Sequence, residues 1–141
     1  MNGCSAHEIQ QGFITKGKNI FKRRSSNILN IPWYSDEGLK NAIYDFVGDN
    51  TIGDTKKIYP NTSMFVLAMN MTQNKLKVYD NIDGKDDNYK LLDVSLDTSA
   101  AMIYFPIRNH DGDAYVDGGI REVCPVMTHA IGLKKKLGIS F

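Results

Sequence analysis

The segment SMFVLAMNM, residues 63–71, constrains the fold of this chain more than any other segment does. It is a nearly continuous apolar run of strand length, which is typical of a strand covered on both faces. The next segment, LKVYD at 76–80, alternates between apolar and polar residues as a half-exposed neighbouring strand does. The sequence therefore predicts a sheet with packed layers around it.

Helical patterns surround these strands, at 5–22, at 36–47, at 91–102 and from Pro125 onward. The clearest helix is 36–47, with Ser35 as its predicted N-cap and Gly48 as its predicted end. DAYVD at 113–117 is a further short strand. Because strands alternate with helices and one strand is fully buried, we expect an α/β domain.

The composition is that of a single globular domain covering residues 1–141. The chain is 42% hydrophobic and 23% charged with a formal net charge of +1. This near-balance gives no general attraction to nucleic acid. One local cluster of positive charge stands out, and we expect it to be a solvated segment, with binding to anionic lipid headgroups as the alternative. Its members are Lys16, Lys18, Lys22, Arg23 and Arg24.

The N-terminal segment MNGCSAHEIQQ carries no apolar region of the kind a signal peptide needs. We therefore expect a cytoplasmic location, with Cys4 and Cys124 as reduced thiols. No apolar run has the length of a transmembrane helix. Contact with a membrane would then be peripheral.

Asp117 is the first candidate for chemistry. It ends the predicted strand at 113–117 and is followed at once by Gly118 and Gly119. A carboxylate at the C-terminal end of a strand lies where α/β domains usually bind ligands. The two glycines let the backbone turn sharply and let other groups approach closely. The alternative is that Asp117 only caps a turn, since Asp-Gly is a common turn dipeptide.

Ser5 is the second candidate. GCSAH at residues 3–7 matches the nucleophile elbow G-x-S-x-G except at its last position, with Gly3 in the first. In such an elbow the serine hydroxyl is exposed at a strand-to-helix turn, and the helix N-terminus favours an oxyanion. Taken alone, a four-fifths match is weak, and a frayed chain terminus is the better interpretation.

The C-terminal third resembles the patatin-like phospholipase family. The resemblance is carried by TSAA at 98–101, YFP at 104–106, YVDGG at 115–119 and Pro125 at the start of the last helix. It extends less specifically over the middle of the chain, so that it covers essentially the whole sequence. It implies a three-layer α/β domain with a mixed, mostly parallel sheet.

The resemblance also implies an activity. Patatin-like proteins are lipid acyl hydrolases with a Ser-Asp dyad, no catalytic histidine and no cofactor. Carried over, Ser5 would attack the ester carbonyl of a lipid substrate, and Asp117 would accept the serine proton. We therefore expect a phospholipase or serine esterase of lipid degradation.

The chain departs from the family pattern in three places. His7 replaces the final glycine of the elbow, and Val123 with Cys124 replaces two asparagines. Only two residues precede Gly3, so the family's first strand and glycine-rich oxyanion loop are expected to be missing. The alternative function is therefore an inactive remnant or a binding subunit that needs another chain. A free edge along 64–69 would then promote self-association and make the isolated monomer marginally stable.

Metal binding is the remaining possibility that the sequence raises. Cys4 with His7, and Cys124 with His129, are spaced loosely like two zinc half-sites, but their separation argues against zinc. NHDGD at 109–113 lacks the ligand order of an EF-hand and predicts a plain turn. We expect no bound metal.

Overall fold

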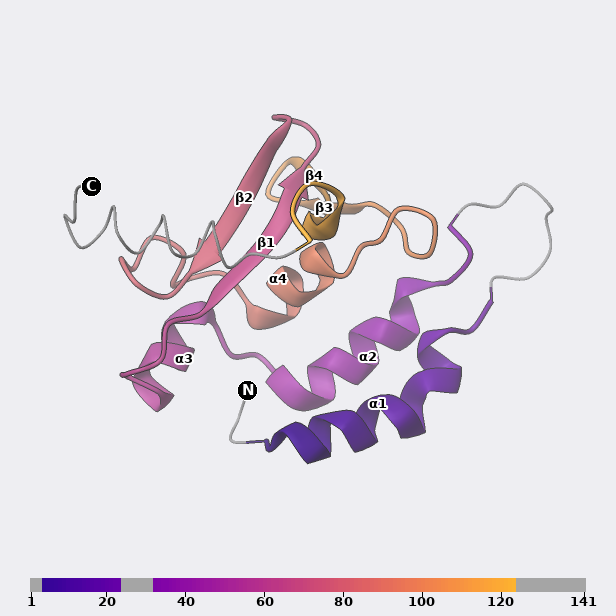
Figure 1. Ribbon diagram of the computed structural model, residues 1–141, viewed down its shortest axis with the longest axis horizontal. Coiled ribbons are helices and arrows are strands. Elements are labelled where there is room, and N and C mark those ends of the chain that lie inside the picture. Colours follow the sequence, from indigo (N-terminus) through magenta and orange to yellow (C-terminus); the bar gives the residue numbers. More distant parts are fainter. Residues whose placement is uncertain (1–3, 24–31, 124–141) are drawn as a thin grey trace.

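The computed structural model describes residues 4–23 and 32–123 (Figure 1). In chain order the elements are α1 (Ala6–Ile20), α2 (Asp36–Val47), α3 (Ile52–Ile58), β1 (Phe65–Asn70), β2 (Lys75–Asp80), α4 (Leu91–Thr98), β3 (Arg108–His110), β4 (Asp113–Asp117) and the 3-10 turn η1 (Gly118–Ile120). The bounds of α2 and β4 are those that the sequence predicts. The predicted helix after Pro125 lies outside the described residues.

The strands form one sheet in the order β2-β1-β4-β3, and all its pairings are antiparallel. The prediction of a mostly parallel sheet is therefore wrong for these four strands. For the β1–β2 and β3–β4 pairings, the physical reason is the length of the connections. β2 follows β1 after residues 71–74, and β4 follows β3 after Asp111 and Gly112, whose φ values are 51° and 81°. Such tight turns join antiparallel strands, whereas parallel strands need a long crossover.

β1 is a central strand. Ala68 lies opposite Lys77 of β2 on one side and opposite Asp117 of β4 on the other. A fully free edge along residues 64–69 is therefore not found, because β4 pairs with residues 68–70. β2 and β3 are the outer strands, where association through a sheet edge stays a prediction. The missing first strand and oxyanion loop also stay predictions.

Three helices lie one on another over one face of the sheet (Figure 1). α4 packs on β1 and β4, α2 packs on α4, and α1 packs mainly on α2. The core between them contains Ala68, Tyr79 and Tyr115 from the strands and Val94 and Leu96 from α4. Within the part of the chain that the structure describes, helices cover this face alone. The third layer stays a prediction.

The opposite face of the sheet is apolar as well. Leu67 and Met69 alternate with the core-facing residues of β1, and both are buried, as is Val116 of β4. β1 is therefore buried on both faces along residues 67–70, as its continuous apolar run predicts.

The ends of α2 follow the predicted chemistry. The Ser35 side chain accepts a hydrogen bond from the Glu37 backbone N–H, and Gly48 ends the helix with a φ of 57°. α3 was not predicted, because seven residues are too few to show a helical period. Its signal is the capping box formed by Thr51 and Asp54.

Among the helices of the described segments, none has both the length and the apolar character that crossing a membrane requires.

Candidate active site

Asp117 is fixed by its backbone and by its side chain. It is the last residue of β4 and pairs with Ala68 of the central strand. Its backbone N–H donates to the Ala100 carbonyl at 3.0 Å, and its Oδ1 accepts from the Gly119 N–H at 2.8 Å. No other described residue donates a hydrogen bond to this carboxylate. One carboxylate oxygen therefore orients the side chain, and the other accepts no hydrogen bond from the described residues.

Glycine is required at position 118 because the surrounding backbone leaves no room for a side chain. A Cβ at this position would lie 2.5 Å from the carbonyl oxygen of Leu67, which is backbone and cannot move aside. The same oxygen accepts a hydrogen bond from Thr98 Oγ1 at 2.7 Å. Neither Gly118 nor Gly119 has a positive φ. The expectation of a sharp turn is thus met by the tight turn η1, while the need for glycine at Gly118 comes from close approach.

Ser5 is the N-cap of α1, held in a capping box with Glu8. The Glu8 backbone N–H donates to Ser5 Oγ at 3.3 Å, and the Ser5 hydroxyl donates to Glu8 Oε2 at 2.9 Å. The Ser5 backbone N–H donates to the same carboxylate oxygen at 2.6 Å. These bonds, the backbone one first, hold the pKa of Glu8 below its ordinary value. A lowered pKa makes Glu8 a weaker base than an ordinary glutamate.

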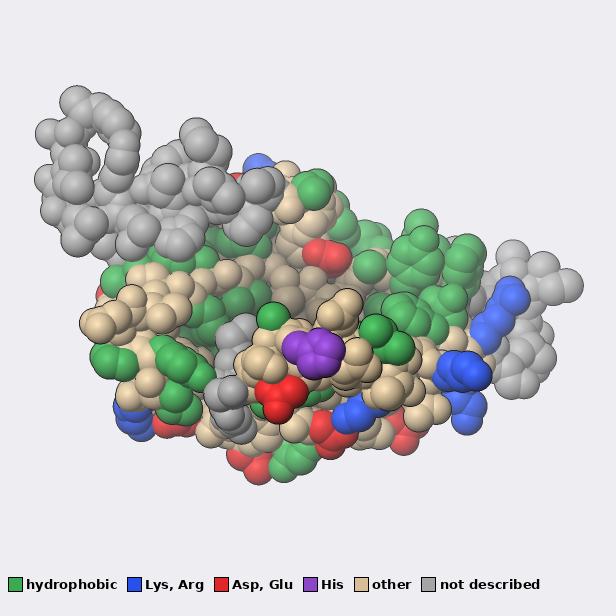
Figure 2. Space-filling model, turned by 60° about the horizontal axis from the view of Figure 1, so that its bottom comes forward, with side chains coloured by type: hydrophobic (Ala, Val, Ile, Leu, Met, Phe, Trp, Pro, Cys, Tyr) green, Lys and Arg blue, Asp and Glu red, His purple; other side chains and the backbone are tan. Residues whose placement is uncertain are grey.

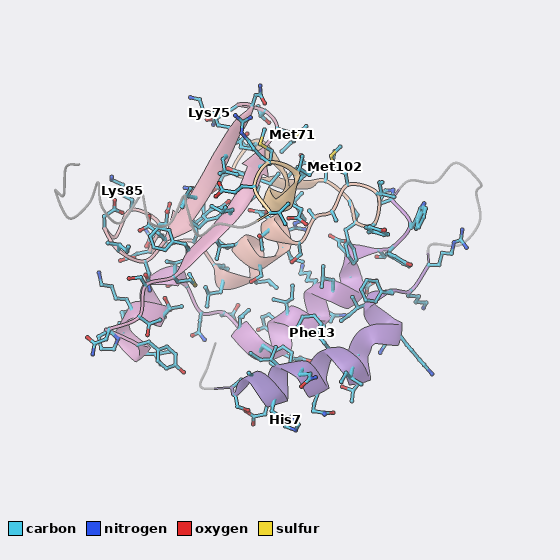
Figure 3. All side chains as sticks on the ribbon, viewed as in Figure 1. His7, Phe13, Met71, Lys75, Lys85 and Met102 are labelled. Atoms are coloured by element: carbon cyan, nitrogen blue, oxygen red, sulfur yellow. The ribbon has the colours of Figure 1, made fainter. Side chains whose placement is uncertain are left out.

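The structure does not bring the two predicted dyad residues together. Each side chain is engaged locally, Ser5 with Glu8 and Asp117 with Gly119. Figure 1 shows the N-terminal end of α1 well separated from β4 and η1. In Figure 3, His7 points outward from α1 at the bottom of the view. Met102, from the loop after α4, lies in the upper part of the view. The dyad stays a prediction, and Gly3 lies outside the described residues.

Sequence reasoning missed a buried polar cluster next to the core. Asp97 of α4 is fully buried, and its Oδ2 accepts from the Tyr79 hydroxyl at 2.9 Å and lies 3.0 Å from His110 Nδ1. Burial raises the pKa of Asp97, and burial also raises the pKa of Tyr79. The cluster joins α4 to β2 and β3. Its signal was an acidic residue on the apolar face of a helix, which needs a polar partner inside the protein.

The predicted metal half-sites are not assembled in the ranges 4–23 and 32–123, where no three metal-binding side chains lie together. Cys4 is a free thiol and His7 is exposed. Cys124 and His129 lie outside the described residues. The NHDGD segment forms the turn between β3 and β4, which confirms that prediction.

A surface hollow of about 400 Å³ lies between α1 and α2. Its charged lining residues are Lys16, Lys22, Glu37 and Asp45. Neither Ser5 nor Asp117 borders it. A lining of mixed charge suits water or small polar molecules better than an acyl chain.

Comparison with known proteins identifies the family. The sequence model of the patatin-like phospholipases matches residues 7–129. The chain therefore belongs to the patatin-like phospholipase family. The matched range includes Asp117 and begins two residues after Ser5.

A characterised relative is similar over most of this chain. It is the cGAMP-activated phospholipase of Pseudomonas aeruginosa (strain BWHPSA011 / Pa011), 29% identical over 125 residues. The alignment covers 82% of this chain and 36% of the relative. The chain thus matches about a third of the length of that protein.

Proposed function

We propose that this chain is a lipid acyl hydrolase that uses a dyad of Ser5 and Asp117 and acts on phospholipid or neutral lipid esters. The observation that carries the proposal is the construction around Asp117. A carboxylate at the end of an inner strand is held by a glycine turn that closes against the Leu67 carbonyl. A general base needs such fixed geometry, with one oxygen left for its partner.

The proposed chemistry uses Ser5 and Asp117. Ser5 Oγ attacks the ester carbonyl while Asp117 takes the hydroxyl proton, and the carbonyl electrons pass to the oxyanion. Collapse of this intermediate breaks the ester C–O bond, and the departing alkoxide takes the proton from Asp117 and leaves as the alcohol. Water, activated by the same carboxylate, then releases the fatty acid and frees the serine. The position of Ser5 at the N-terminus of α1 favours the oxyanion, since backbone N–H groups point toward it.

This chemistry requires a rearrangement. Ser5 must leave the Glu8 carboxylate and reach Asp117, so the N-terminal end of α1 has to lie against β4 and η1. We propose that the closed arrangement needs structure beyond the described residues.

A non-catalytic role is the second candidate, and the capping box favours it. Ser5 satisfies its hydrogen bonds with Glu8, as an N-cap serine does in many helices without catalytic function. In that case the chain would be a binding subunit or an inactive family member.

Ester turnover by the 141-residue chain separates the two candidates. We expect slow hydrolysis of a short-chain ester and of a phospholipid, abolished by Ser5→Asn and by Asp117→Asn. Asparagine is as good an N-cap as serine, so Ser5→Asn removes the nucleophile and keeps α1 capped. Ser35→Asn, the same substitution at the N-cap of α2, is the matched control and should leave the turnover unchanged. Turnover that survives Ser5→Asn and Asp117→Asn would eliminate the dyad, and no turnover in the parent chain would favour the non-catalytic role.

A further inference from the structure

Four large apolar side chains are exposed together at one end of the molecule. Phe21, Trp33, Ile103 and Tyr104 have exposed fractions between 45% and 55%. We call this group the apolar platform. Single exposed apolar residues are ordinary, but a contiguous group marks an interaction surface.

The apolar platform is built from three chain segments that are distant in sequence. The Trp33 N–H donates to the Ile103 carbonyl at 3.1 Å, and the Tyr34 N–H donates to the Tyr104 carbonyl at 2.9 Å. The Trp33 and Tyr104 rings meet edge to face at 5.6 Å, and those of Phe21 and Tyr34 at 5.4 Å. Backbone bonds and ring packing therefore hold these side chains in place while leaving them half exposed.

Positive charge borders the apolar platform. Lys18, Lys22 and Arg23 are exposed and form no ion pair with another described residue. Figure 2 shows hydrophobic side chains gathered at the right-hand end of the molecule, next to Lys and Arg side chains. Two exposed acids of α2, Glu37 and Asp45, line the same hollow as Lys22.

We propose that the apolar platform docks on a lipid bilayer that carries anionic headgroups. Trp and Tyr are the residues that favour the boundary between headgroups and acyl chains, since their rings are apolar with one polar atom. Lys and Arg beside them are attracted to the negative surface of such a bilayer. The combination of exposed rings with exposed cations matches both the apolar and the charged character of such a membrane surface.

A second copy of the chain fits this surface less well. A stable protein interface needs about 800 Å² from each partner. Four half-exposed side chains of this size offer roughly 400 Å². The cations would also face one another across a two-fold interface, where they repel. Insertion into a bilayer requires no such area, because a few side chains and their charges are sufficient.

The apolar platform is connected to Asp117. Ile103 and Tyr104 belong to the loop between α4 and β3, and Ala100 in the same loop accepts the Asp117 backbone N–H. A bilayer on the platform would therefore lie along the loop that leads to the proposed acid. The docking proposal names the surface on which the proposed hydrolase acts, but it does not depend on ester cleavage.

Trp33 is the only tryptophan of the chain, so its fluorescence reports on the apolar platform directly. The test uses the unmodified chain with vesicles of ether-linked phosphatidylcholine and phosphatidylserine, which a hydrolase cannot cleave. We expect a blue shift of the emission and quenching by lipids brominated on the acyl chain. The blue shift and the quenching should both be weaker with vesicles of phosphatidylcholine alone, which lack the anionic lipid. They should also be weaker at high salt, which screens the charges. Emission that stays unchanged on bound vesicles would overturn the proposal.

Variants assign the binding to named side chains. In vesicle sedimentation, Lys22→Gln with Arg23→Gln should lower the partition coefficient about thirtyfold. The charge-matched control is Lys75→Gln with Lys85→Gln, two exposed lysines away from the apolar platform (Figure 3). Ile103→Ser should weaken binding about tenfold, and Ile58→Ser, at the exposed end of α3, should not. Equal losses in the variants and their controls would overturn the assignment.

Further measurements separate a bilayer from a second copy of the chain, and docking from hydrolysis. If sedimentation velocity without lipid shows dimers, and Ile103→Ser abolishes them, a second copy of the chain replaces the bilayer as the partner.

Ser5→Asn should bind ether-lipid vesicles as the parent chain does. If the parent binds vesicles but hydrolyses nothing, the docking surface stands and the proposed hydrolysis fails. If the parent chain hydrolyses soluble esters but does not bind vesicles, the proposed hydrolysis stands and the docking surface fails. Circular dichroism of each variant confirms that it is folded.

Discussion

The two predicted dyad residues lie in very different surroundings. Asp117 ends a strand that pairs with the centre of the sheet, and its turn closes against the backbone of β1. Ser5 caps an outer helix that packs mainly on α2, and its hydrogen bonds to described residues are all to Glu8 or within α1. The backbone of Asp117 is thus held by contacts distant in sequence, whereas Ser5 is held by contacts within four residues.

This difference teaches which half of the site the described chain can build on its own. Long-range contacts over-determine the position of Asp117, so it keeps its geometry without help. The Ser5 capping box only requires that α1 begins there, and it would survive almost any placement of that helix. The catalytic arrangement therefore depends on what positions α1.

The largest expected effect is at Gly118. Gly118→Ala places a Cβ 2.5 Å from the Leu67 carbonyl oxygen, so β1 and the turn must separate. We expect a loss of about 3 kcal/mol in the free energy of unfolding. Gly17→Ala in α1, where no atom lies within 4 Å of the new Cβ, should instead gain roughly 0.5–1 kcal/mol. Urea unfolding measures both, and a harmless Gly118→Ala would mean that the Asp117 turn is not tightly built.

Two threonines give the next comparison. Thr98→Val removes the hydroxyl that donates to the Leu67 carbonyl under the Asp117 turn. We expect a loss of about 1–2 kcal/mol, because a part-buried acceptor loses its partner. Thr15→Val in α1 removes an exposed hydroxyl bonded to Gln11 within its own helix and should change stability by less than about 0.5 kcal/mol. Thermal unfolding of the two variants, compared with the parent, checks the order; equal effects would contradict the contrast between the two regions.

Ser5 offers a test of its structural role. Ser5→Ala should cost about 1 kcal/mol through loss of the N-cap, whereas Ser5→Asn should cost only a few tenths. Hydrogen exchange of the first turn of α1 localises the effect. If both variants protect this turn as the parent does, the serine does not serve as a cap, and a different partner must hold its hydroxyl.

Local chemistry made much of this fold predictable. The Ser35 cap, the Gly48 end and the alternation of DAYVD fixed α2 and β4 to the residue. The direction of the strands was not predictable in the same way, since the family resemblance suggested parallel pairing. The Asp-Gly pair at 111–112, flanked by residues of two short strands, was the overlooked signal for a hairpin.

Of the candidate site, the Asp117 turn was predictable from the sequence, and the placement of Ser5 was not. Asp117 and its glycines could be read from sequence because the turn is local, although the reason for Gly118 needed the position of Leu67. The separation of Ser5 from Asp117 could not be read, because a motif records spacing along the chain and not the packing of α1. The Asp97 cluster likewise depends on β2 and β3 meeting α4.

The smallest expected effect compares two capping boxes at acidic pH. Hydrogen bonds from Lys57 and Thr51 lower the pKa of Asp54 from 3.8 to about 2, and the Ser5 bonds lower the pKa of Glu8. Carboxylates with a lowered folded pKa stabilise the fold above their unfolded pKa, and this contribution disappears as the pH falls through the folded value. Stability should therefore fall between about pH 4 and pH 2, and Asp54→Asn should flatten that fall slightly. Glu8→Gln should do the same if the box at Ser5 is as well formed as the one at Thr51. Unfolding midpoints measured at each pH decide this, and a Glu8→Gln profile identical to the parent would show that the Ser5 hydroxyl is not committed to Glu8 and is free to reach Asp117.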